Sequence, residues 1–176
     1  MATHRLGLPA ETLREMAALG RDVRFVMILR DPLDRLRSGL KQNLRKSKGA
    51  DAVTAEGLAA HMAAAAEDLE DPNMRRSRYE ATVRAFDAAG LSDQVCYLFY
   101  ETMFQQSEMD RLADFLGVAR RPAPVARKVH PSAYGKLGFP AEVEARALAA
   151  LAPTYDFVRA RFGDAVPAKW ARPTAP

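Results

Sequence analysis

The sequence contains few of the residues that form disulfides and metal sites. Among its 176 residues there are three histidines and a single cysteine, Cys96. One cysteine excludes an internal disulfide, and we therefore expect the protein to reside in a reducing compartment. Neither a His-Glu-x-x-His motif nor a pair of cysteines occurs in the sequence. The sequence therefore predicts no metal site.

Long hydrophobic runs are also missing. No apolar stretch reaches the length of a membrane-spanning helix, and the start has no basic segment followed by an apolar one. We therefore expect no membrane span and a cytoplasmic location. The composition, 48% hydrophobic and 27% charged, is typical of a soluble globular protein. The length fits one domain over residues 1–176, and the net charge of +4 favours anionic ligands.

The most informative segment is residues 23–48, VRFVMILRDPLDRLRSGLKQNLRKSK. Its first part, Val23–Leu29, is an apolar run that barely alternates, which is typical of a strand buried on both faces. Arg30 follows at the carboxyl end of this strand, where open α/β sheets bind their ligands. Asp31 is suited to be the N-cap of a helix and Pro32 its first residue.

The helix predicted after Pro32 has one apolar stripe, and its other faces are basic. Ser38 lies two turns into it, eight positions after Arg30. A strand-end guanidinium and a hydroxyl on the next helix, amid positive charge, suit an anionic group such as phosphate. The helix N-terminus adds a favourable dipole. The stripe is Leu33, Leu36, Leu40 and Leu44, and the basic residues are Arg35, Arg37, Lys41, Arg45 and Lys46.

The remaining pattern predicts an α/β protein with more helix than sheet. A second apolar strand is expected over Val95–Tyr100. Both strands demand neighbours, because two parallel strands do not make a stable sheet with both faces covered. Either a third strand lies in a segment interpreted as helical, or the first βα unit is missing. Helices are expected over residues 8–19, 54–69, 75–89, 107–116, 140–151 and 153–162, and an irregular binding loop over 120–138.

Three segments resemble the sulfotransferase family, which transfers sulfuryl groups from 3′-phosphoadenosine 5′-phosphosulfate (PAPS). The family binds the donor's 3′-phosphate with a hydrophobic strand, an Arg-(Asp/Asn)-Pro turn and a serine eight residues after the arginine. Here these are Leu29-Arg30-Asp31-Pro32 and Ser38. The second match is LFYETM at 98–103, followed by Phe-Leu-Gly at 115–117. The third is Arg-Phe-Gly-Asp at 161–164, which is similar to the end of many bacterial members.

The resemblance implies a P-loop-NTPase-like sulfotransferase fold, with a small parallel sheet flanked by many helices. It implies PAPS as the donor and adenosine 3′,5′-bisphosphate as the product, with Arg30 and Ser38 binding the 3′-phosphate. Tyr79 resembles a family tyrosine near the nucleotide. The loop that holds Lys128 and Lys136 resembles a basic loop that closes over the 3′-phosphate. The acceptor is expected to be a small molecule or glycan with a hydroxyl or amine, and no catalytic residue is assigned.

Each of these residues also has a structural interpretation. Arg30 alone would fit a salt bridge at the sheet edge, and Ser38 alone would fit a solvated helix position. Tyr79 opens an amphipathic helix, where an aromatic side chain usually belongs to the core. Lysines such as Lys128 and Lys136 are common in loops. The spacing of Arg30 and Ser38 within the full motif favours phosphate binding.

The sequence departs from the family at its start. Members begin with a strand and a Gly- and Thr-rich loop that cradles the donor's 5′-phosphosulfate, and this chain has no Gly-x-x-x-x-Gly-Lys-(Ser/Thr) or Gly-Thr-Thr. We therefore expect a single, truncated domain without its first strand, whose unpaired sheet edge favours a homodimer. Two alternatives remain. One is a nucleotide-binding remnant without catalysis, and the other is a basic domain for nucleic acid or an acidic protein. The sequence has no nucleic-acid-binding motif.

Overall fold

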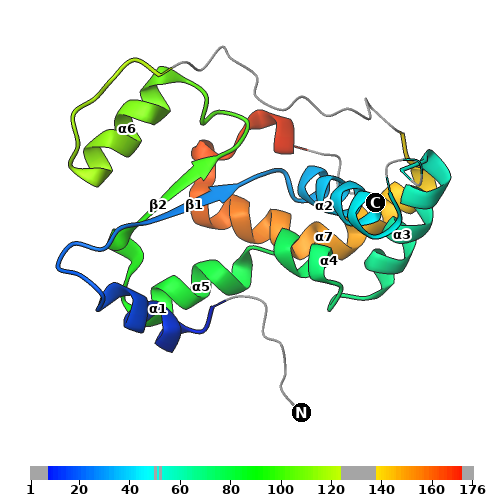
Figure 1. Ribbon diagram of the computed structural model, residues 1–176, viewed down its shortest axis with the longest axis horizontal. Helices are drawn as coiled ribbons and strands as arrows, with labels where there is room; N and C mark the ends of the chain where they lie inside the picture. Colours follow the sequence, from blue (N-terminus) through cyan, green and yellow to red (C-terminus); the bar gives the residue numbers. More distant parts are fainter. Residues whose placement is uncertain (1–7, 50, 52, 124–137, 172–176) are drawn as a thin grey trace. The chain divides into compact units, whose positions relative to one another are not determined.

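The computed structural model describes residues 8–49, 51, 53–123 and 138–171. The chain forms two compact units, the first from Met1–Arg30 and Glu80–His130 and the second from Asp31–Tyr79 and Pro131–Pro176. A small parallel sheet lies in the first unit, and helices make up most of the rest (Figure 1). The α/β class predicted from the sequence is therefore confirmed, with a small parallel sheet and many helices.

The sheet of the first unit pairs β1 (Phe25–Leu29) with β2 (Val95–Phe99) in parallel, with Phe25 opposite Val95 and Leu29 opposite Phe99. Helices α1 (Ala10–Ala17) and α5 (Glu80–Ala89) pack against each other. They enclose a small core in which the rings of Phe25 and Phe86 meet edge to face at 5.2 Å. The buried residues of this core are Leu13, Phe86, Leu91 and Val95.

One face of β1 is exposed, so the prediction of a strand buried on both faces is wrong. Val26 is 44% and Ile28 49% exposed, whereas Leu29 is fully buried. Within the residues that the structure describes, the sheet has two strands only, so β1 is an edge strand. An apolar run shows that a strand is suited to burial, but it does not supply the element that would cover it.

Helix α6 (Gln106–Leu116) follows β2 after the short turn that contains Tyr100, and it ends at Leu116, as predicted, with Gly117 as its C-cap. Arg111 of this helix donates to the Sγ atom of Cys96 at 3.3 Å and to the carbonyl of Tyr97 at 2.7 Å. The hydrogen bond with Glu108 raises the pKa of Arg111 above its ordinary value. Arg111 therefore connects α6 to the second strand. A 3₁₀ turn, η2 (Ser92–Gln94), precedes that strand.

The second unit is helical. Helix α2 (Pro32–Lys48) packs against α3 (Ala55–Glu67), α4 (Pro72–Ser77) and α7 (Ala141–Phe162). The predicted leucine stripe of α2 faces this core, and each of its four leucines is at most 3% exposed. Two 3₁₀ turns, η3 (Gly163–Ala165) and η4 (Ala168–Trp170), follow α7. The other buried apolar residues of the four helices include Leu58, Met62, Met74, Ala147, Leu151 and Val158.

Two helix boundaries differ from the prediction. The two closing helices expected on either side of Pro153 are one helix, α7, with the proline inside it. Its buried face continues across the proline at helical spacing, so packing compensates for the lost backbone hydrogen bond. The single helix expected over 75–89 is two helices instead, because Asp71 and Pro72 start α4 and the chain leaves helical geometry at Arg78.

Candidate functional site

Arg30 directly follows β1 and is half-buried. Its guanidinium lies over the ring of Tyr100, with the Cζ atom 5.0 Å from the ring centroid. Tyr100 directly follows β2, and its amide donates to the carbonyl of Leu29 at 2.7 Å, which extends the strand pairing by one residue. The ring of Tyr100 is in turn edge to face with Phe104. The carboxyl ends of the two strands thus bring together a guanidinium and an exposed aromatic pair.

The cation–π contact restrains the direction of the Arg30 side chain. A cation over the face of an aromatic ring is attracted by the electrons of that face, so the contact favours one position of the guanidinium. The motif LFYETM contains Tyr100, but no local pattern in the sequence predicts that its ring would contact Arg30. The contact between Arg30 and Tyr100 follows from the register of the sheet, because each residue directly follows one of two strand ends that lie side by side.

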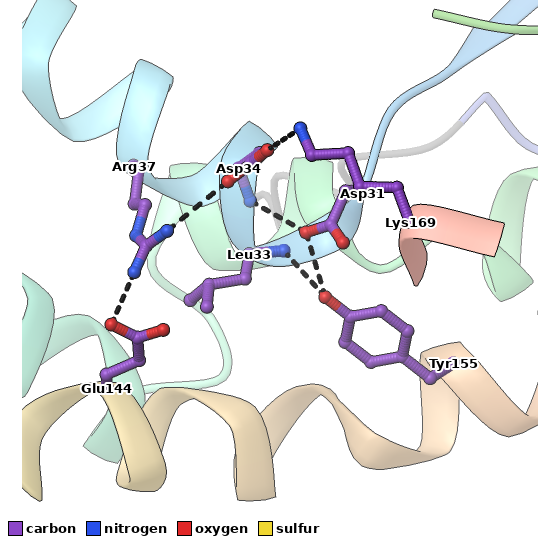
Figure 2. Close-up of polar contacts among 7 residues, drawn as sticks. All are labelled: Asp31, Leu33, Asp34, Arg37, Glu144, Tyr155 and Lys169. Carbon is purple, nitrogen blue, oxygen red and sulfur yellow. Dashed lines mark hydrogen bonds and ion pairs between the residues drawn. The ribbon is translucent and has the colours of Figure 1, made fainter. Parts of the chain in front are cut away.

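The start of α2 is closed by a buried cap in the second unit. Asp31 is fully buried, and its Oδ1 atom accepts hydrogen bonds from the amide of Asp34 at 3.0 Å and from the hydroxyl of Tyr155 at 2.9 Å. The Tyr155 hydroxyl also accepts from the amide of Leu33 at 3.3 Å. Figure 2 shows the tyrosine reaching this cap from α7. The predicted roles of Asp31 as N-cap and Pro32 as first residue are confirmed.

A chain of charges continues from the cap along the first turns of α2. Asp34 accepts from Lys169 at 2.9 Å and from Arg37 at 3.3 Å, and Arg37 also pairs with Glu144 (Figure 2). The Arg37 guanidinium lies 5.2 Å from the ring centroid of Phe139. These contacts connect α2 to the first turn of α7 and to η4. Arg37 therefore serves the packing of the second unit.

Ser38 lies on the exposed face of α2. On a helix its neighbours one turn away are Asp34 and Arg35 before it and Lys41 and Gln42 after it, so its hydroxyl sits among mostly polar and basic side chains. Arg30 and Ser38 belong to different compact units, and each is described within its own unit. The two side chains offer positive charge and a hydroxyl.

The other residues singled out from the sequence differ in their surroundings. Tyr79 lies between α4 and α5 and is 5% exposed. Its contact with a nucleotide stays a prediction. Lys128 and Lys136 lie outside the described residues.

Two features that bear on other kinds of site are absent from the described residues. Across 8–49, 51, 53–123 and 138–171, no three His, Cys, Asp or Glu side chains gather in a way that could hold a metal ion. None of the helices described is both long and apolar enough to span a membrane.

Comparison with known proteins gives one match. The family model described as a sulfotransferase domain matches residues 2–136, which include Arg30, Ser38 and Tyr100. Tyr155 lies beyond the matched region. No curated protein and no solved structure matches the chain.

Proposed function

Since the chain belongs to the sulfotransferase domain family, we propose that it transfers a sulfuryl group from PAPS to a hydroxyl or amine. In this proposal Arg30 and Ser38 bind the 3′-phosphate of the donor, and Tyr79, Lys128 and Lys136 are further candidates for contact with it. The product is adenosine 3′,5′-bisphosphate, and the acceptor is a small molecule or glycan. The family match supports sulfuryl transfer in general.

The observation that carries the proposal is the position of Arg30. It stands at the carboxyl end of β1, its guanidinium lies over the ring of Tyr100, and a charged side chain held there is suited to an anionic ligand. The exposed hydroxyl of Ser38 comes eight residues later, which is the spacing that the family uses for the same phosphate. A phosphate dianion would accept charge-assisted hydrogen bonds from both side chains.

The 3′-phosphate is remote from the bond that breaks, so its binding energy serves to orient the donor. In sulfuryl transfer the group moves in line from the donor phosphate to the acceptor atom, and the protein's main contribution is positioning and charge stabilisation. The sequence contains no Gly-x-x-x-x-Gly-Lys-(Ser/Thr) pattern. Because that pattern is typical of the loop that holds the transferred group, binding of the donor and transfer of the sulfuryl group are measured in separate assays.

The binding claim is tested with two nucleotides that differ by one phosphate. Adenosine 3′,5′-bisphosphate carries the 3′-phosphate and AMP does not, so the ratio of their dissociation constants in isothermal titration calorimetry isolates recognition of that group. Arg30→Ala should weaken binding of the bisphosphate by one to two decades, since hydrogen bonds to charged groups contribute roughly 1.5–3 kcal/mol. Ser38→Ala should weaken it by less, and neither should change AMP binding.

The matched control is Lys46→Ala, which removes one positive charge from an exposed position on the same helix. This variant should leave the ratio of the two dissociation constants unchanged, because salt screens an exposed charge two helical turns away from Ser38. If wild type binds both nucleotides equally, or if the Lys46 variant loses as much as the Arg30 variant, the proposed phosphate site is wrong. Transfer itself is measured as adenosine 3′,5′-bisphosphate released from PAPS in the presence of candidate acceptors.

A further inference from the structure

The second half of α2 carries a row of positive charges, Lys41, Arg45 and Lys48, which we call the basic row. Its members follow one another at spacings of four and three residues, so they lie on one face of the helix. Arg45 and Lys48 are exposed, and neither forms an ion pair within the part of the chain that the structure describes. Arg37, one turn before Lys41, is by contrast held by two carboxylates. Arg45 and Lys48 are therefore available to a partner.

The basic row has no negative charge between its members. Residues 41–48, KQNLRKSK, contain four cations and no acidic residue. The exposed Ser38 lies three residues before Lys41 and on the same face of the helix. The hydroxyl and the basic row thus form one polar strip of α2, which belongs entirely to the second unit.

The basic row is longer than one small anion. At 1.5 Å per residue, Lys41 and Lys48 are about 10 Å apart along the helix axis. A phosphate or sulfate ion can contact only part of such a row, whereas a chain with repeated negative charges can contact all three side chains. The carbonyl end of the helix dipole also disfavours a lone anion near Lys48. Several ion pairs formed together offset that cost, so the row suits a linear polyanion.

Nucleic acids and acidic glycans are both linear polyanions, and the second unit favours a glycan. Proteins that bind single-stranded nucleic acid stack the bases on aromatic side chains. Among the residues that the structure describes, no aromatic side chain of the second unit is exposed. A glycan with carboxylate or sulfate groups needs no such platform, because lysine and arginine can pair with its charges directly.

We propose that the basic row of α2 is an anchoring surface for an anionic glycan, whose carboxylate or sulfate groups pair with Lys41, Arg45 and Lys48. This inference rests on the function proposed above, because it makes the acceptor a charged polysaccharide rather than a small molecule. The row follows Ser38, whose proposed ligand, the 3′-phosphate, is remote from the transferred group. The row therefore holds a part of the glycan away from the reacting hydroxyl, as only a long acceptor allows.

The test uses a heparin oligosaccharide as the probe and an uncharged dextran of the same length as its control, in isothermal titration calorimetry at two salt concentrations. Wild type should bind heparin, more weakly as the salt concentration rises, and should not bind dextran. Arg45→Ala and Lys48→Ala should each weaken heparin binding by about two- to fivefold. The double variant should weaken it by about tenfold, because the two exposed charges act independently.

The matched control is Lys46→Ala, which removes the same charge from an exposed position of the same helix. Successive residues are about 100° apart around a helix, so Lys46 lies off the face that carries Arg45. Its loss should weaken heparin binding by less than about twofold. If Lys46→Ala weakens heparin binding as much as Arg45→Ala does, only the net charge matters and the inference is overturned.

The outcomes separate this inference from the function on which it rests. If wild type prefers adenosine 3′,5′-bisphosphate to AMP but does not bind heparin, the phosphate site stands and the anchoring surface is wrong. If heparin binding depends on the basic row but the bisphosphate is not preferred, the row binds glycans and the proposed donor site fails. If duplex DNA of the same total charge binds more tightly than heparin, and through the same residues, the partner is a nucleic acid and the inference is overturned.

Discussion

Gly39 lies on α2 one residue after Ser38 and packs against Asn73 of α4. It is buried, and a Cβ atom at this position would lie 2.5 Å from Oδ1 of Asn73 and 2.7 Å from Nη1 of Arg35. The Arg35 atom is the far end of a long side chain and can move away. The Asn73 side chain is short and 2% exposed, so it has little room to do so. Gly39→Ala therefore forces an overlap with Asn73.

Two effects of opposite sign decide how Gly39→Ala changes the free energy of unfolding. Helix propensity alone favours alanine over glycine by about 1 kcal/mol in a helix interior. Overpacking in a buried contact costs about 1–3 kcal/mol. We expect the cost of the overlap to exceed the gain in helix propensity. The net loss should be about 1 kcal/mol in the free energy of unfolding, or about 2–4 °C in Tm for a chain of this length.

Urea unfolding followed by circular dichroism measures the free energy, and Asn73→Ala provides the matched background. Oδ1 of Asn73 has no hydrogen-bond partner among the described residues, so its removal sacrifices packing but no hydrogen bond at that atom. In the Asn73→Ala background, Gly39→Ala should cost less than in wild type and approach the gain expected from propensity. The reasoning is refuted if Gly39→Ala alone stabilises the protein, or if its cost is the same in both backgrounds.

Arg120→Ala should raise the pKa of Asp114, because the hydrogen bond from Arg120 holds that pKa below its ordinary value of 3.8. A depressed carboxyl pKa stabilises the fold above the unfolded pKa, and this contribution is lost as the pH falls through the folded pKa. Both side chains are more than half exposed, so the effect on stability should be small, and NMR titration of the Asp114 carboxyl measures the shift directly. An unchanged pKa contradicts this assignment. We also propose that the exposed face and edge of β1 favour self-association, so Val26→Lys and Ile28→Lys should reduce the dimer fraction in sedimentation velocity. A wild-type protein that stays monomeric over a wide range of concentration argues against it.

The sequence predicted well the elements that local signals define. The Asp31-Pro32 start of α2 and its leucine stripe follow from capping and helical spacing, and both are confirmed. The same Asp-Pro signature occurs at Asp71-Pro72, where α4 begins, whereas the helix expected in this region was placed to start at residue 75. The start of α4 could therefore have been predicted from the sequence.

The features that the sequence did not predict depend on contacts between distant residues. Pro153 indicates a helix end locally, and only the buried face shared by both halves of α7 carries the helix through it. The bond between Tyr155 and Asp31 joins residues 124 positions apart, and no local pattern marks it. The cation–π contact of Arg30 with Tyr100 likewise depends on how β1 and β2 are aligned.

The backbone amides in the first turn of α2 contribute less to phosphate binding than the sequence suggested, because they already have hydrogen-bond partners. The sequence suggested that the helix N-terminus would contribute, but the amides of Leu33 and Asp34 are already bonded to Tyr155 and Asp31. What remains is the helix dipole, worth about 0.3–1 kcal/mol near a surface. A charge-assisted hydrogen bond from a side chain contributes roughly 1.5–3 kcal/mol, and the Asp31 carboxylate beside the helix start opposes an anion. Side-chain recognition by Arg30 should therefore dominate, so affinity for the 3′-phosphate should depend more on that guanidinium than on the dipole of α2.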